Sequence, residues 1–206
     1  MIVAKNLSLV LGGNTIFQNL DFIIKESSIT QIEGANGSGK SSLLKCIVGI
    51  HNNFDGDISI DSCKVTRKNL SQYAKLISFF IDKDFSYPYL SVKDNLKIFA
   101  YYNGKKYMDP DLEELFKDFD LMQFSDIKVG KLSAGYRQKL EIILAMINAG
   151  KYVLLDEPLN NLDSGSISVL YNYIQRDIKD TRSYIIVSHN DSNLSDISHQ
   201  QIKLEL

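Results

Sequence analysis

The chain has 206 residues, which suits one α/β domain, and its 44% hydrophobic and 23% charged residues are ordinary for a folded protein. A net charge of −2 gives no sequence-wide argument for binding nucleic acid, and no stretch approaches the roughly 18 apolar residues of a membrane span. Cys46 and Cys63 are too few for a disulfide framework, the three histidines form no metal-binding cluster, and no signal peptide is visible, so we expect a cytosolic chain with reduced thiols.

The N-terminal part has the pattern of short strands. Residues 3–10, 15–17 and 20–24 alternate in polarity, with a glycine-rich turn at 12–14. A further strand is predicted at 29–33, directly before a conspicuous glycine-rich loop.

That loop, residues 34–41, fits the phosphate-binding pattern G-x-x-x-x-G-K-[ST] at every fixed position and precedes a predicted helix at 42–48. Its glycines let backbone N–H groups surround phosphate oxygens, and the helix N-terminus adds its positive dipole end. Lys40 is expected to reach the β- and γ-phosphates, and the Ser41 hydroxyl to bind Mg²⁺. The predicted ATP-binding residues are Gly34, Ala35, Asn36, Gly37, Ser38, Gly39, Lys40, Ser41 and Ser42.

The middle of the chain changes from strand to helix. Strands are predicted at 56–61 and 74–81, followed by a helix capped by Ser91 and another with Pro110 at its first position. We expect residues 85–148 to be a mainly helical subdomain within one domain, whose core comprises about 1–84 and 149–206.

Two strongly apolar strands follow, at 152–155 and 184–187, with a helix between them at 164–179. Continuous apolar strands flanked by helices indicate an α/β fold with a buried, mostly parallel sheet. Asp156 and Glu157 come directly after the first of these strands, at the sheet edge where α/β proteins bind ligands. Asp156 is the expected Mg²⁺ partner of Ser41, and Glu157 is positioned to take a proton from an attacking water.

With these motifs in this order, the chain resembles the ATP-binding cassette (ABC) family. Residues 132–138 resemble its signature sequence, and Ser133 precedes Asp156 by 23 residues. A helix from Arg137 to Asn148 is expected to follow. Residues 159–163 resemble the family's D-loop, and His189, 32 residues after Glu157, matches its switch histidine.

The resemblance implies a P-loop NTPase fold of ABC type, with an N-terminal antiparallel β subdomain, a parallel core and a helical insert. It further implies that Lys40, Glu157 and His189 catalyse ATP hydrolysis with Mg²⁺. Two copies would form a dimer, in which Ser133 and Gly135 of one contact ATP on the other. Integral membrane subunits would be the partners, at the inner face of the cell membrane, and no nucleic acid is expected.

The chain departs from the family pattern in three respects. Asp82 stands where a glutamine is usual, and its carboxylate is a candidate third Mg²⁺ ligand. Leu11 stands where an aromatic residue usually stacks on adenine, so we expect looser nucleotide selectivity. Ala134 and Tyr136 replace the usual glycine and glutamine of the signature.

Within the family, the chain is most similar to the haem-exporter ATPases of cytochrome c maturation. The similarity lies in residues 31–34 and 40–44, in the signature and in the short length, whereas Ile81 and Asp82 replace a usual Gly-His pair. The alternatives are an ATPase of another small exporter and a soluble, non-transport ABC ATPase.

Overall fold

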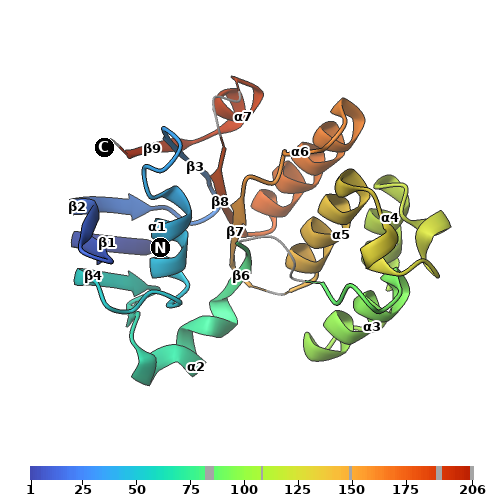
Figure 1. The fold of residues 1–206 in the computed structure, drawn as a ribbon, viewed down its shortest axis with the longest axis horizontal. Coiled ribbons are helices and arrows are strands. Elements are labelled where there is room, and N and C mark those ends of the chain that lie inside the picture. Colours follow the sequence, from blue (N-terminus) through green and yellow to red (C-terminus); the bar gives the residue numbers. More distant parts are fainter. Residues whose placement is uncertain (82–85, 108, 149, 189–191, 205–206) are drawn as a thin grey trace.

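The computed structural model describes residues 1–81, 86–107, 109–148, 150–188 and 192–204. Within these ranges the strands form two sheets, drawn in Figure 1. An antiparallel sheet has the order β2-β1-β4-β5, with β1 at Ile2–Leu11, β2 at Asn14–Ile24, β4 at Asp55–Ile60 and β5 at Cys63–Lys64. A parallel sheet has the order β6-β7-β8-β3-β9, with β3 at Ile29–Gly34, β6 at Ile77–Phe80, β7 at Tyr152–Asp156, β8 at Ser183–Val187 and β9 at Gln200–Leu204.

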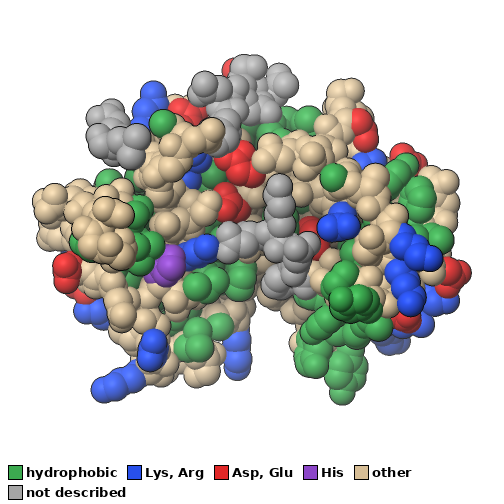
Figure 2. Space-filling view, viewed as in Figure 1, with side chains coloured by type: hydrophobic (Ala, Val, Ile, Leu, Met, Phe, Trp, Pro, Cys, Tyr) green, Lys and Arg blue, Asp and Glu red, His purple; other side chains and the backbone are tan. Residues whose placement is uncertain are grey.

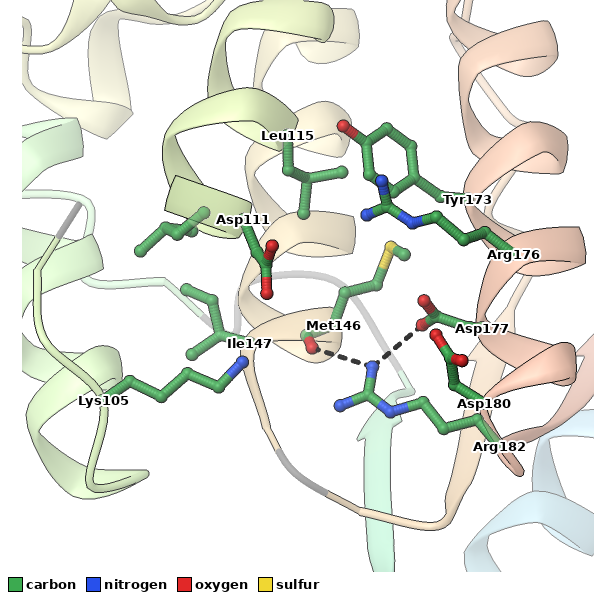
Figure 3. Close-up of a pocket in the computed structure, with 11 residues that line it drawn as sticks. Lys105, Asp111, Leu115, Met146, Ile147, Tyr173, Arg176, Asp177, Asp180 and Arg182 are labelled. Carbon is green, nitrogen blue, oxygen red and sulfur yellow. Dashed lines mark hydrogen bonds and ion pairs between the residues drawn. The ribbon is translucent and has the colours of Figure 1, made fainter. Parts of the chain in front are cut away.

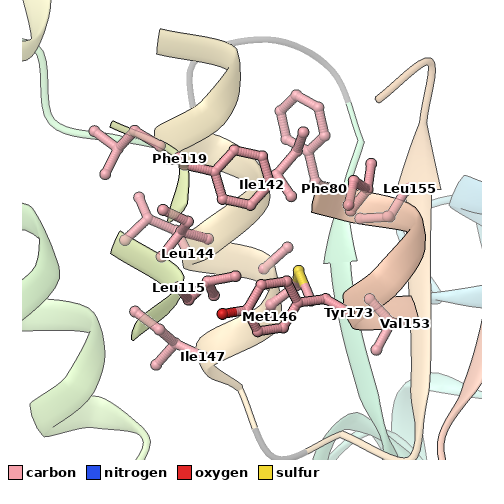
Figure 4. Close-up of a cluster of buried hydrophobic side chains, with 14 of the residues drawn as sticks. Phe80, Leu115, Phe119, Ile142, Leu144, Met146, Ile147, Val153, Leu155 and Tyr173 are labelled. Carbon is pink, nitrogen blue, oxygen red and sulfur yellow. The ribbon is translucent and has the colours of Figure 1, made fainter. Parts of the chain in front are cut away.

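The parallel sheet is buried on both faces, as its continuous apolar strands predict. Along β7, Tyr152 and Leu154 point into one hydrophobic cluster, whereas Val153 and Leu155 point into another. The first cluster packs the sheet against helix α1 (Lys40–Ile47) and the antiparallel sheet. The second packs it against helices α3 to α6, as Figure 4 shows for Phe80, Val153 and Leu155.

The remaining helices are α2 (Leu70–Tyr73), α3 (Val92–Tyr102), α4 (Pro110–Asp118), α5 (Ala134–Ile147), α6 (Ser164–Lys179) and α7 (Ser192–Ile197). The predicted cap at Ser91 is confirmed, since its side chain accepts a hydrogen bond from Asp94 N. Pro110 is the first residue of α4, as predicted, and α6 has the predicted bounds.

Two predicted elements were partly wrong. Residues 74–76 form a 3₁₀ turn after α2, so the strand expected at 74–81 is confined to Ile77–Phe80; a short apolar run does not distinguish helix from strand by periodicity alone. Helix α5 begins at Ala134 instead of Arg137, because the Ser133 side chain already caps it by accepting from Tyr136 N.

The predicted α/β fold, with its antiparallel N-terminal sheet and parallel core, is confirmed. Among the helices within the described ranges, none is long and apolar enough to cross a membrane.

Candidate functional site

The phosphate-binding loop and the acidic pair lie at the same edge of the parallel sheet. Ile32 of β3 and Asp156 of β7 both stand opposite Val187 of β8, which runs between these strands. With neighbouring strands about 4.8 Å apart, the backbones at 32 and 156 are about 10 Å apart. The loop that follows β3 and the carboxylates that end β7 therefore face one shared space at the carboxyl edge of the sheet.

Lys40 is the first residue of α1, and its side chain turns back into the loop. Its ammonium group donates hydrogen bonds to the carbonyl oxygens of Gly34 at 2.8 Å and Ala35 at 3.0 Å. The residue is only 6% exposed. A buried ammonium group held by neutral carbonyls favours an anion at the same place, because carbonyls do not neutralise its charge. The predicted phosphate contact of Lys40 thus has a preformed cationic group.

The loop also has the close backbone approach that a phosphate cradle needs. A β-carbon at Gly34 would lie 2.4 Å from Ser38 Oγ and 2.6 Å from the Leu204 carbonyl oxygen, so only glycine fits. Ser38 is buried, and its Oγ has no hydrogen-bond partner within the described part of the chain. Ala35, Asn36 and Gly37 form the exposed tip.

The oxygen donors at this edge fit a magnesium ion. Ser41 follows Lys40 on α1, and Asp156 ends β7; both side chains are partly buried. Hydroxyl and carboxylate oxygens are the ligands that Mg²⁺ takes beside phosphates. A bound Mg²⁺ would neutralise charge on the phosphates, and these two residues would hold it.

Glu157 has a strained backbone that three hydrogen bonds hold. Its φ of 50° lies in the left-handed region, which costs a non-glycine residue of order 1–3 kcal/mol. Its N–H donates to the Val187 carbonyl at 3.0 Å, and its own carbonyl accepts from Asn160 N and from Gln138 Nε2, both at 3.3 Å. Strain that neighbours over-determine in this way is typical of a residue whose side chain must be aimed.

Gln138, the last residue of the signature segment at 132–138, is a supporting residue whose role the sequence does not predict. It is 6% exposed on α5, and its amide also donates to the Pro158 carbonyl at 3.1 Å. The signature helix therefore fixes the loop after β7. Its place at the end of the signature segment was the signal available in the sequence, but nothing in the sequence indicates which loop it reaches.

Ser133 and Gly135 are placed at the N-terminus of α5, where Ser133 is exposed. A β-carbon at Gly135 would lie 2.7 Å from the Asn161 carbonyl oxygen. The glycine therefore lets the signature helix approach residues 159–163, in addition to the ATP contact that the family resemblance implies for it.

Asp163 ends the D-loop segment and caps α6. It accepts from Ser166 N at 2.8 Å and pairs with Lys139 of α5 at 3.1 Å. The backbone N–H of Ser166, the Lys139 ammonium and the Ser166 hydroxyl lower the pKa of Asp163 to about 2. The carboxylate joins the signature helix to α6.

Leu11 is 36% exposed at the end of β1, before the turn that leads to β2. Ser42 lies on α1. Asp82 and His189 lie outside the described residues, so their predicted roles stay predictions.

Two further hollows lie among the helices. One, of about 210 Å³, lies between α4, α5 and α6 (Figure 3). In it Arg182 pairs with Asp177 at 2.9 Å and donates to the Met146 and Asn148 carbonyls at the end of α5, so the arginine completes the helix terminus. The other, of about 330 Å³, is an apolar groove, named here the α3 groove. It is lined by Phe79, Tyr87, Ile98, Phe99, Tyr102, Asn103, Leu144, Ala145 and Asn148.

Known proteins are similar to this chain over most of its length. The family model described as ABC transporter matches residues 17–160. The chain is 31% identical over 196 residues to a macrolide export ATP-binding/permease protein of Campylobacter jejuni, covering 92% of this chain and 31% of that protein. It therefore spans about a third of the length of that relative.

Other relatives are nearer in length. A tyrosine transport ATP-binding protein of Clostridioides difficile is 32% identical, covering 92% of this chain and 82% of the relative. A cytochrome c biogenesis ATP-binding export protein of Idiomarina loihiensis is 27% identical over 209 residues, covering 100% of this chain and 93% of the relative.

Solved structures show the same fold. An ATP-binding subunit of an ABC transporter superposes with a TM-score of 0.87 at 20% identity, covering 99% of this chain and 85% of that one. A dimeric ATP-binding cassette bound to ADP and Pi superposes with a TM-score of 0.82 at 24% identity, covering 100% and 94%. The family match, which spans the phosphate-binding loop, signature and acidic pair described above, identifies the chain as a member of the ABC transporter family.

Proposed function

We propose that this chain is the ATP-hydrolysing subunit of a membrane exporter and works as a homodimer. In this proposal Lys40 binds the phosphates, Ser41 and Asp156 hold Mg²⁺, and Glu157 accepts a proton from the attacking water. Asp82 as a third metal ligand and His189 beside the γ-phosphate complete the proposed set.

The observation that carries the proposal is the shared register of β3 and β7 on Val187. It supports a composite site, because the loop holding Lys40 and the strand ending in Asp156 open at one edge. The strained and hydrogen-bonded backbone of Glu157 supports its role as the base, since catalysis needs a fixed carboxylate.

Exposure of Ser133 supports the dimer. It stands at the start of α5, a helix of 14 residues, where the helix dipole favours an anion. The Ser133 hydroxyl accepts a hydrogen bond from Tyr136 N, which leaves the hydroxyl proton to donate to a phosphate of a second copy. A structurally similar cassette is described as dimeric with ADP and Pi.

The α3 groove is the proposed contact for the membrane subunits, at the inner face of the membrane. Figure 2 shows hydrophobic side chains gathered over α3. Tyr101 and Tyr102 are 81% and 78% exposed, and Tyr89 is 85% exposed. Clustered exposed aromatic residues mark interaction surfaces, since a rigid amphipathic ring gains most when it is covered.

For the exported substrate we propose haem, in cytochrome c biogenesis. The cytochrome c biogenesis relative supports this choice because it matches the whole chain and nearly its own whole length. The competing candidates are another small exporter, such as one resembling the macrolide relative, and a soluble non-transport ATPase.

The dimer is tested with Glu157→Gln, which keeps size and hydrogen bonding but removes the base. Light scattering with saturating ATP and Mg²⁺ should give a stable dimer, whereas Glu113→Gln, at an exposed position of α4, should behave like the unmodified chain. A Glu157→Gln variant that stays monomeric, or that hydrolyses ATP at the unmodified rate, would contradict the mechanism.

The partner and substrate are tested in cells. Detergent extraction should recover membrane subunits with the chain, and recovery with ribosomes or DNA instead would favour the soluble alternative. Deleting the gene should remove the absorbance of c-type haem proteins, and Glu157→Gln should fail to restore it. Normal c-type cytochromes after deletion would rule out haem export.

A further inference from the structure

We infer that Gln31 is a positioning residue for hydrolysis, which fixes the Glu157 backbone through the end of β8. The inference rests on the proposed role of Glu157 as the base. Gln31 lies on β3, three residues before the phosphate-binding loop, and its side chain is fully buried.

The amide of Gln31 joins three elements. Its Nε2 donates to Ser188 Oγ at 3.0 Å, directly after β8. Its Oε1 accepts from Ser195 Oγ of α7 at 3.1 Å. Ser198 Oγ lies 3.4 Å from the same oxygen but only 2.7 Å from the Leu194 carbonyl, so its single proton belongs to that carbonyl.

These bonds fix the chain at 187–188, and that position in turn fixes Glu157. The Val187 carbonyl accepts the Glu157 N–H at 3.0 Å, and Ser188 N donates to the Ile32 carbonyl at 3.4 Å. Two buried side-chain amides therefore hold the Glu157 backbone, one on each side. Gln138 binds its carbonyl directly, and Gln31 holds the strand end that binds its N–H.

A fully buried amide side chain on this strand needs a reason. A buried amide costs free energy unless its hydrogen bonds are made, and an apolar residue of equal length would avoid that cost. The Gln31 amide bonds to Ser188 at the end of β8, next to the residue that binds the Glu157 N–H, whereas Lys40 in the loop bonds to Gly34 and Ala35.

Because the Gln31 bonds do not involve Lys40, we expect a change in kcat and little change in ATP binding. Misplacing a catalytic group by about 1 Å costs about 100-fold in rate. Loss of the Gln31 bond should therefore lower kcat for ATP at least tenfold, while KM and the Kd for ATP change less than twofold.

The test uses Gln31→Met, of similar length without the amide, and Ser188→Ala, which removes the other partner. If Gln31→Met does not fold, Ser188→Ala alone decides. The matched control is Ser183→Ala, at the other end of β8, whose buried hydroxyl has no hydrogen-bond partner in the described part of the chain; its kcat should be unchanged.

A second measurement distinguishes a positioning role of Gln31 from a general loss of order in the protein. Adding Gln31→Met to Glu157→Gln should lower single-turnover hydrolysis no further, because the aimed group is already gone. A multiplicative loss, or a weaker ATP Kd in Gln31→Met, overturns the inference. If Glu157→Gln abolishes turnover but Gln31→Met and Ser188→Ala keep the unmodified kcat, the inference fails and the proposed function stands. If Glu157→Gln itself keeps normal turnover, both fail.

Discussion

Helix α5 connects two regions that are built in different ways. Around its N-terminal half, Gln138 binds backbone carbonyls after β7 and Gly135 touches the Asn161 carbonyl. Near its C-terminal end, Leu144 and Ala145 line the α3 groove, where aromatic and aliphatic side chains meet. The carboxyl edge of the parallel sheet thus depends on the exact positions of backbone groups, whereas the α3 groove depends on the apolar surface of side chains. Single substitutions should therefore lower ATP turnover far more at the sheet edge than in the groove.

The largest effect is expected at Lys40, where Lys40→Ala removes the buried cation from the loop. Loss of a charged group aimed at developing phosphate charge should lower ATP turnover about 10²–10³-fold. Steady-state phosphate release measures it. Lys45→Ala, on the same helix, is the control and should keep most of the turnover. Equal losses in both variants would mean that α1 as a whole was disturbed.

Gly135→Ala should come next, because its new methyl group meets backbone and not a flexible side chain. Overpacking of this kind costs about 1–3 kcal/mol of unfolding free energy, measured by urea denaturation, and turnover should fall as well. Gly165→Ala in the first turn of α6 meets only the Asp163 carboxylate at 3.3 Å and should be neutral or stabilising. A stable, fully active Gly135→Ala chain would contradict the tight contact.

Asp163 is expected to show a smaller effect that depends on pH. Asp163→Ala removes the cap of α6 and should cost about 1 kcal/mol of unfolding free energy near pH 7. Because the folded pKa of about 2 lies below the unfolded value, this carboxylate stabilises the fold above about pH 4 and loses that contribution as the pH falls toward 2.

Asp163→Asn distinguishes the cap from the charge. It keeps an oxygen for Ser166 N but cannot titrate, so it should retain most of the stability at pH 7 and show a flatter dependence below pH 4. Urea titrations at several pH values measure both variants. An unchanged pH dependence in Asp163→Asn would assign the acid sensitivity to other carboxylates.

The smallest effect in the isolated chain is expected at Tyr102. Its side chain is 78% exposed, so Tyr102→Ala should shift the unfolding free energy within about 0.5 kcal/mol and leave turnover unchanged. Recovery of membrane subunits with the chain should nevertheless fall. Lys106→Ala, at another exposed position shortly after α3, is the control. Normal recovery with Tyr102→Ala would remove this residue from the proposed contact.

Charge pairing at the opposite end of β7 provides a contrast with the site. Asp61 accepts hydrogen bonds from Lys151, the Met1 ammonium and Tyr152. Burial alone would raise the pKa of Asp61, but these bonds outweigh it and hold the pKa well below its usual range. This cluster joins the two sheets, so one strand has a structural charge network at its beginning and the two acids of the proposed site at its end.

The sequence by itself determined the chemistry. The loop at 34–41 and the acids after a buried strand are local patterns, and the signature serine was identified by its resemblance to the family motif. Helix caps at Ser91, Ser133 and Asp163 could likewise be predicted or rationalised locally, because a cap bonds to N–H groups within three residues.

Only the tertiary structure decided what supports that chemistry. The partner of Gln31 lies 157 positions further along the chain, and the partner of Gln138 lies 19 positions further. The close approach of Gly135 to Asn161 spans 26 positions. The pairing of β3 and β7 with the same strand brought these groups together, and no local pattern encodes such a register. The physical reason is that hydrogen bonds and steric contacts depend on distance in space, whereas propensities and motifs depend on distance along the chain.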